Sequence, residues 1–417
     1  MPVEEDTLGS VLADVLASSH RLAPRAIPDL VRDAGRRLGL SAARVYVADL
    51  QQRDLVALPH SEQGRGYDAD GGTADSETLP IENSLAGRAY RTETVQVGRP
   101  DAADGGRGGT GTERTGWIPV VDGIGRVGVL RVTAPELDAR LLRRCEAFAD
   151  LLAMILATKE QYSDLLAQTM RTRPMSVQAE LLWAFLPPRT IGTAVVSSSA
   201  VLEPAYEVGG DAYDHSLAGD VLHLTLLDAM GHDLASGGCS AMALAACRSA
   251  RRAGGRLDDI AVGIDRTLDR WIPGRLLTCV IADLDTSTGR LDWINCGHPP
   301  PLLIRDRRVV TGALDRAPRP PLGLTGYDLP PPRVHSAHLQ PGDRLLLFTD
   351  GVTDARSGTG DLFGEQRLAD AVVRALTDGL PAPEALRRLI EQILVHQNQR
   401  LSDDATLLLT EWHPGRR

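Results

Sequence analysis

The chain has 417 residues, of which 43% are hydrophobic and 24% charged, and its formal net charge is −10. This length predicts two or three domains, and the acidic balance argues against a nucleic-acid-binding protein, which needs a basic face. The five cysteines form no CxxC pair, which predicts buried free thiols in a reducing compartment. The acidic start, MPVEED, and the lack of an apolar run of about 18 residues predict a cytoplasmic protein with no membrane partner.

The first third of the chain alternates amphipathic helices with short apolar strands. We expect helices at residues 1–20, 27–38 and 83–90, and strands at 43–48, 55–58, 94–97, 117–121 and 127–132. This order predicts an α+β fold class. The segments SLAGRAYRT and WIPVVDGIGRVGVLRV, followed by a long helix, resemble a GAF domain. The resemblance implies an N-terminal helix at 1–21 and a GAF-like sensor domain at 22–157. GAF domains bind a small-molecule ligand in some members and act as dimerisation modules in others.

Helical periodicity continues through residues 141–170, and a helical linker is expected at 158–189. Apolar positions recur at alternating steps of four and three, at Phe148, Leu152, Ile155, Tyr162, Leu166 and Thr169, with Lys159 in the remaining position. Such a heptad seam fits the stalk of a parallel homodimer. An amphipathic helix packed on its own domain gives the same pattern, so both interpretations stay open from the sequence.

The rest of the chain, 190–417, reads as one larger domain. Expected strands are 194–201, 221–227, 276–283, 290–296, 301–304, 344–349 and 405–411, and expected helices are 235–252, 257–271, 364–378 and 383–398. Two sheets flanked by helices would account for this order.

Four aspartates in this domain adjoin strand-like apolar runs: Asp211, Asp228, Asp350 and Asp403. An isolated buried charge costs several kcal/mol even after the protein relaxes. Four carboxylates that converge at one edge of a sheet therefore need a cation between them. Oxygen ligands select hard ions such as Mg²⁺ or Mn²⁺, so the sequence predicts a carboxylate-built metal centre.

Five motifs in this domain resemble the SpoIIE/RsbU-type branch of the metal-dependent PPM (protein phosphatase 2C-like) serine/threonine phosphatases. They are EVGGDAYD, DAMGHD, NCGHPPPLLI, DRLLLFTDGVTDA and DDATLLL, in this order. The resemblance implies an αββα sandwich with two Mn²⁺ or Mg²⁺ ions between the sheets. Asp228 would bridge both ions, with the carbonyl of Ala229 completing one coordination shell. Asp211 would hold one ion, mainly through water, and Asp350 and Asp403 the other; Asp404 would be an outer-shell group or a substitute ligand.

The same resemblance implies direct attack of a metal-activated water on phosphoserine or phosphothreonine. No Ser-His-Asp or Cys-Arg cluster is evident for a covalent route. The implied substrate is a phosphorylated STAS-domain anti-anti-sigma factor in a bacterial partner-switching pathway, with the GAF-like domain gating the phosphatase. The alternative is a catalytically silent pseudophosphatase that binds a signalling partner. The GGD at 209–211 also occurs in diguanylate cyclases, but that interpretation leaves the downstream aspartates unexplained.

Other polar residues near the motifs have simpler interpretations. His298, in GHPPP, is expected to make structural hydrogen bonds rather than transfer a proton. Asp214, Asp233 and Asp354 are expected to be solvated or to cap helices, although Asp233 adds a negative charge beside the predicted ions. No dedicated phosphate-binding arginine is evident from the sequence.

Overall fold

The computed structural model describes residues 5–59, 77–99, 113–324, 327, 329–377, 379–399 and 401–413. The chain divides into two compact units, Met1–Pro174 and Met175–Arg417. The division falls inside the predicted linker, whose first part packs in the N-terminal unit and whose second part packs in the C-terminal unit. In the described residues, no helix is long and apolar enough to cross a membrane.

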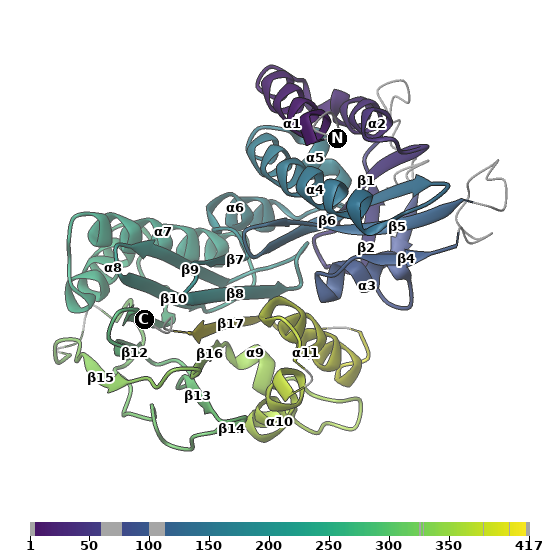
Figure 1. Ribbon diagram of the computed structural model, residues 1–417. Helices are drawn as coiled ribbons and strands as arrows, with labels where there is room; N and C mark the ends of the chain where they lie inside the picture. The colour runs from purple at the N-terminus through teal and green to yellow at the C-terminus, as the bar shows by residue number, and fades with distance from the viewer. Residues whose placement is uncertain are drawn as a thin grey trace. The chain divides into compact units, whose positions relative to one another are not determined.

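The N-terminal unit is built on one antiparallel sheet with the strand order β3-β2-β1-β6-β5-β4 (Figure 1). Its strands are β1 (Ala42–Ala48), β2 (Asp54–Ala57), β3 (Thr78–Pro80), β4 (Gln96–Gly98), β5 (Arg114–Asp122) and β6 (Gly125–Ala134). Its helices are α1 (Glu5–Ser19), η1 (Pro24–Ala26), α2 (Ile27–Leu38), α3 (Leu85–Thr92), α4 (Ala139–Glu160) and α5 (Asp164–Met170).

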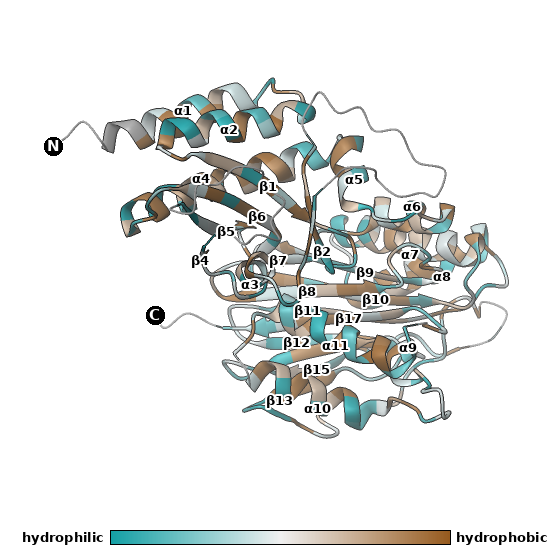
Figure 2. Cartoon of the chain, turned by 90° about the vertical axis from the view of Figure 1, so that its right-hand side faces the viewer, coloured by the Kyte–Doolittle hydropathy of each residue, from teal (hydrophilic) through white to brown (hydrophobic). Residues whose placement is uncertain are grey.

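The two faces of this sheet bury different side chains. Helices α1, α2 and α4 cover one face through a core that includes Val31 and Phe148. Alternating brown and teal along α1 and α2 in Figure 2 shows their amphipathic character. Helix α3 covers the other face, where Tyr46, Tyr90 and Trp117 are buried. The order of elements agrees with the α+β layout expected from the sequence.

The predicted heptad seam is buried inside the N-terminal unit. Phe148, Leu152 and Ile155 of α4 and Leu166 of α5 belong to its core. The helix also breaks after Glu160, and Tyr162 in the break is 62% exposed. Of the two interpretations that the sequence left open, a helix packed on its own domain therefore accounts for the periodicity.

The C-terminal unit contains two antiparallel sheets. The first has the order β15-β12-β11-β10-β9 and the second β14-β13-β16-β17-β8-β7. The first sheet consists of β9 (Asp211–Ala218), β10 (Val221–Ala229), β11 (Leu277–Asp285), β12 (Arg290–Cys296) and β15 (His335–His338). The second consists of β7 (Thr190–Gly192), β8 (Val196–Glu203), β13 (Leu302–Arg305), β14 (Arg308–Val309), β16 (Arg344–Phe348) and β17 (Ala405–Trp412).

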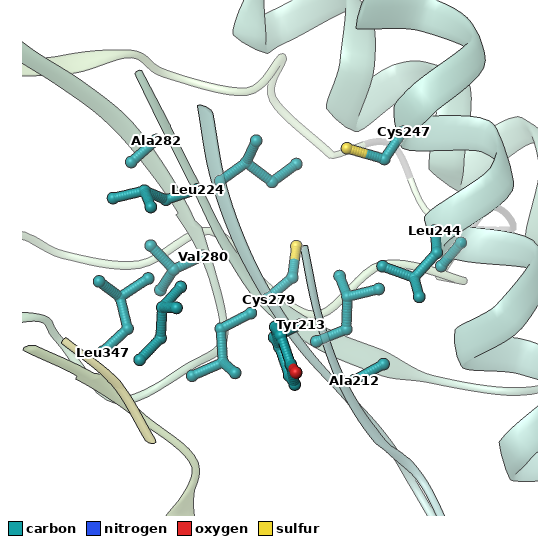
Figure 3. Packing of buried hydrophobic residues seen from close by; sticks show 14 of the residues in the cluster. Ala212, Tyr213, Leu224, Leu244, Cys247, Cys279, Val280, Ala282 and Leu347 are labelled. Atoms are coloured by element: carbon teal, nitrogen blue, oxygen red, sulfur yellow. The ribbon is translucent and has the colours of Figure 1, made fainter. Parts of the chain in front are cut away.

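Helices flank both sheets of this unit. They are α6 (Val177–Phe185), α7 (Leu234–Arg252), α8 (Leu257–Trp271), α9 (Asp350–Thr353), α10 (Gly364–Thr377) and α11 (Ala382–His396). Leu224 and Val280 of the first sheet pack with Leu347 of the second, and Leu244 of α7 joins the same core from the helix side (Figure 3). A separate core lies between the second sheet and helices α10 and α11. This is the expected αββα sandwich.

Strand β9 was missed in the sequence because polar residues interrupt its pattern. Asp214 and His215 are each only 2% exposed. Arg248 and Arg251 of α7 pair with the Asp214 carboxylate at 2.7 and 2.8 Å. The His215 ring bonds Ser198 and the carbonyl of Pro188. The prediction that Asp214 is solvated or caps a helix is therefore wrong. All five cysteines are buried and unpaired, as expected.

Candidate metal centre

Asp228 and Ala229 are the last two residues of β10, where the strand reaches the end of the first sheet. Asp228 lies opposite Asp211 of β9 on one side and opposite Thr278 of β11 on the other. The turn that leads into β9 approaches closely, because a Cβ on Gly210 would lie 2.2 Å from the carbonyl oxygen of Ala229. Only glycine fits there, so the GGD sequence places Asp211 beside Asp228 at one end of the sheet.

The second sheet supplies the other predicted carboxylates. Asp350 begins α9 directly after β16, and Asp403 and Asp404 lie just before β17. Strands β16 and β17 are paired, with Phe348 opposite Leu407. A Cβ on Gly351 would lie 1.9 Å from the carbonyl oxygen of Asp404. The glycine in TDG therefore allows the segment that carries Asp350 to lie against the DD pair.

Asp403 and Asp404 have different surroundings. Asp404 is 8% exposed, and its Oδ2 accepts hydrogen bonds from the backbone N–H groups of Gly209, Gly210 and Asp211 at 2.8, 2.8 and 3.1 Å. Asp403 is exposed at the end of the unit. Asp404 thus joins the two sheets by fixing the turn before Asp211, whereas the Asp403 carboxylate stays accessible.

Asp211 is buried between two threonine hydroxyls. Thr349 and Thr406 donate to its Oδ2 at 2.7 and 2.6 Å. Burial, followed by the negative charges of Asp404 and Asp228, raises the pKa of Asp211 well above its ordinary value. These hydroxyls belong to the motifs FTD and DDAT, and the sequence interpretation did not single them out.

The carboxylates at this end of the unit repel one another. Burial, then Asp350 and Asp403, raises the pKa of Asp228 to about 7. Desolvation, then Asp403, raises the pKa of Asp350 as well. No cation is among the main influences on Asp228 or Asp350. In the part of the chain that the structure describes, no three His, Cys, Asp or Glu side chains come together closely enough to hold an ion by themselves.

His298 supports Asp228 from behind. It is 3% exposed, its Nε2 lies 3.1 Å from the carbonyl oxygen of Phe348, and its Nδ1 lies 2.8 Å from Oγ1 of Thr278. Because a carbonyl only accepts, Nε2 carries the proton and Nδ1 accepts from the threonine. Burial lowers the pKa of His298 to about 4, so the ring is neutral. Thr278 Oγ1 is also 3.4 Å from the Asp228 carboxylate, which fits the structural role expected for His298.

Asp233 acts as a helix cap, as expected, and has a cationic partner. Its side chain accepts from the N–H of Ser236 at the start of α7 and contacts Arg275 at 2.8 Å. The hydrogen bond from Arg275 lowers the pKa of Asp233 to about 2. Arg275 therefore balances the negative charge that Asp233 adds beside the predicted ions. Asp354 is exposed and follows α9, also as expected.

Comparisons with known proteins identify a family match in the C-terminal unit and two similar proteins. Residues 218–413 match the family model described as Stage II sporulation protein E (SpoIIE). Protein IcfG of Synechocystis is 32% identical over 127 residues, which cover 30% of this chain and 19% of that protein. Phosphoserine phosphatase RsbU of Bacillus subtilis is 23% identical over 252 residues, which cover 58% of this chain and 72% of that protein.

The solved SiaA-PP2C domain of Pseudomonas aeruginosa is 22% identical, with a TM-score of 0.48, over 56% of this chain and 94% of that one. The match thus extends over about a fifth of IcfG, most of RsbU and nearly all of the solved domain. The family assignment rests on the sequence matches and on the five motifs that lie in the same unit. The C-terminal unit thus contains a SpoIIE-type domain, which the similarity to RsbU places with the PPM serine/threonine phosphatases.

Proposed function

We propose that this chain is a metal-dependent protein serine/threonine phosphatase that hydrolyses phosphoserine or phosphothreonine directly. The observation that carries the proposal is the meeting of carboxylates from both sheets around Asp228, where burial, followed by Asp350 and Asp403, raises the pKa of Asp228 to about 7. Such mutual repulsion has no structural benefit, and divalent cations would relieve it. The proposal agrees with the family of the C-terminal unit.

The chemistry of the donor set suits Mn²⁺ or Mg²⁺ ions. All the available groups are oxygens, which hard divalent cations prefer. Asp228 and the Ala229 carbonyl would hold both ions or one of them, Asp211 would act mainly through water, and Asp350 and Asp403 would hold the second ion. Two bound ions would supply an activated water and neutralise charge that develops on the phosphoryl group.

The protein's own residues would hold this centre in place. The hydrogen bonds of His298 to the Phe348 carbonyl and to Thr278 hold in place the residue that lies opposite Asp228 on β11. Asp404 fixes the turn before Asp211 from the other sheet, and we propose that it acts as an outer-shell group. Rigid support of this kind keeps reacting groups within the narrow tolerance that catalysis requires.

The substrate and the regulation are further parts of the proposal. The similarity to RsbU, named a phosphoserine phosphatase, supports a phosphorylated STAS-domain anti-anti-sigma factor as substrate in a cytoplasmic partner-switching pathway. The N-terminal unit would act as a GAF-like sensor that gates the phosphatase, through a small-molecule ligand or through homodimerisation. Comparing the full chain with residues 175–417 tests the gating; equal rates and equal metal dependence would rule it out.

The activity itself is tested by hydrolysis of para-nitrophenyl phosphate and of a phosphoserine STAS protein. The full chain is assayed with Mn²⁺, with Mg²⁺ and with EDTA, beside Asp228→Ala and Asp350→Ala. Turnover that needs metal and is lost in both variants supports the proposal. If neither the full chain nor residues 175–417 turn over either substrate with metal present, the chain is a pseudophosphatase that binds a partner.

A further inference from the structure

Arg275 contacts the loop that follows the candidate metal centre, although no sequence motif includes it. It comes just before β11, on the approach to Thr278, which pairs with Asp228. Its Nη1 donates to the carbonyl oxygen of Met230 at 3.3 Å, and its Nη2 contacts the carboxylate of Asp233 at 2.8 Å. The guanidinium is therefore held on the loop that directly follows Asp228 and Ala229.

The loop at Gly231 leaves space for the Arg275 guanidinium, and the side chain stays partly exposed to solvent. A Cβ on Gly231 would lie 3.2 Å from Nη1 of Arg275, and Gly231 has a φ of +103°, which disfavours any other residue. The Arg275 side chain is 29% exposed and that of Asp233 58% exposed. These two hydrogen bonds, to Met230 and Asp233, use two of the five N–H donors of the guanidinium. The remaining donors can bind a further anion, or the group can exchange one anion for another.

The negative charge of the carboxylate cluster would oppose phosphate binding, and an arginine nearby would offset that charge. If Asp211, Asp228, Asp350, Asp403 and Asp404 are all ionised, even two divalent cations leave the cluster with one excess negative charge. A phosphate group approaching that cluster would be repelled. An arginine fork matches phosphate oxygens and can bind them through two parallel hydrogen bonds.

We propose that Arg275 is a phosphate-binding residue of this phosphatase and that Asp233 holds its guanidinium in place until the phosphoryl group of the substrate replaces the carboxylate. The inference rests on the proposed function and adds a substrate-binding group to it. A purely structural alternative is that Arg275 only neutralises Asp233. The two interpretations differ in what happens when both charges are removed together.

The test measures binding of inorganic phosphate to the full chain with Mn²⁺ by calorimetric titration, together with KM and kcat for para-nitrophenyl phosphate. The variants are Arg275→Gln, Asp233→Asn and the double variant. The control is Arg290→Gln, which removes another arginine that pairs with an aspartate, Asp292, at the far end of the same sheet. Asn remains a good helix cap, so Asp233→Asn spares the start of α7.

The proposal expects Arg275→Gln to weaken phosphate binding and raise KM roughly tenfold, as loss of one charge-assisted contact does, with a smaller change in kcat. Asp233→Asn should tighten phosphate binding, and the double variant should bind as weakly as Arg275→Gln. Recovery of wild-type affinity in the double variant, or equal behaviour of Arg275→Gln and Arg290→Gln, overturns the assignment. If Arg275→Gln fails to fold, Arg275→Lys takes its place, and wild-type affinity there overturns the bidentate role.

The outcomes separate this inference from the proposed function. Phosphate binding that depends on Arg275 without turnover of any substrate would leave the assignment standing and contradict the phosphatase activity. Turnover by the wild-type chain, with unchanged phosphate affinity in Arg275→Gln, would support the phosphatase activity and contradict the role of Arg275. A wild-type chain that binds no phosphate with Mn²⁺ present overturns the assignment.

Discussion

Replacing Asp228 by Asn should stabilise the metal-free protein, although it removes the residue on which the centre depends. Burial and the neighbouring carboxylates raise the pKa of Asp228 from 3.8 to about 7. For an acid, a raised pKa in the folded state means that stability falls as pH rises from about 4 to about 7 and stays low above that. A pKa raised by about three corresponds to a loss of roughly 4 kcal/mol in the free energy of unfolding at pH 8. Asn mimics the neutral form and escapes this loss.

The assay is thermal unfolding in EDTA at pH 5 and pH 8. At about 2–4 °C per kcal/mol for a domain of this size, Asp228→Asn should raise Tm at pH 8 by roughly 10 °C, and by clearly less at pH 5. The control is Asp220→Asn, an exposed aspartate at the other end of β10, which should change Tm little at either pH. A lower or unchanged Tm for Asp228→Asn at pH 8 would refute the repulsion on which the metal prediction depends.

Two further substitutions test the supporting structure. Asp214→Asn leaves the charges of Arg248 and Arg251 without their buried partner, so the free energy of unfolding, measured by urea denaturation, should fall by roughly 3 kcal/mol; an unchanged value would show that the pair is dispensable. Thr278→Val removes the donor to the buried Nδ1 of His298 and should cost about 1–2 kcal/mol, with kcat reduced more than KM. Full activity in Thr278→Val would contradict the positioning role of this threonine.

The sequence predicted most of the C-terminal fold because its apolar runs are long and bounded by clear turns. The ends of β10, β11 and β16 agree with the expected strands to within a few residues. Strand β9 was missed because a polar residue inside a strand looks like a loop until its partner is known, and the partners of Asp214 lie on a helix about 35 residues later. Tertiary pairing of that kind has no local signal.

The sequence predicted the carboxylates of the candidate site but not the residues that hold them in position. The four aspartates were found because each adjoins an apolar run, and the structure brings Asp228, Asp350 and Asp403 within electrostatic reach of one another. The roles of Thr349 and Thr406 required the register of the two sheets. Arg275 was missed because its approach to Asp233 depends on how the end of α8 returns to β11, which no motif encodes.

The most direct test of the account is a titration of the EDTA-treated full chain with Mn²⁺, followed by electron paramagnetic resonance and calorimetry. The account predicts two ions per chain for the wild type, with magnetic coupling between them, and loss of at least one ion in Asp350→Ala while Asp220→Asn binds normally. Absence of Mn²⁺ and Mg²⁺ binding, or binding that persists in both Asp228→Ala and Asp350→Ala, would contradict a metal centre built from these carboxylates.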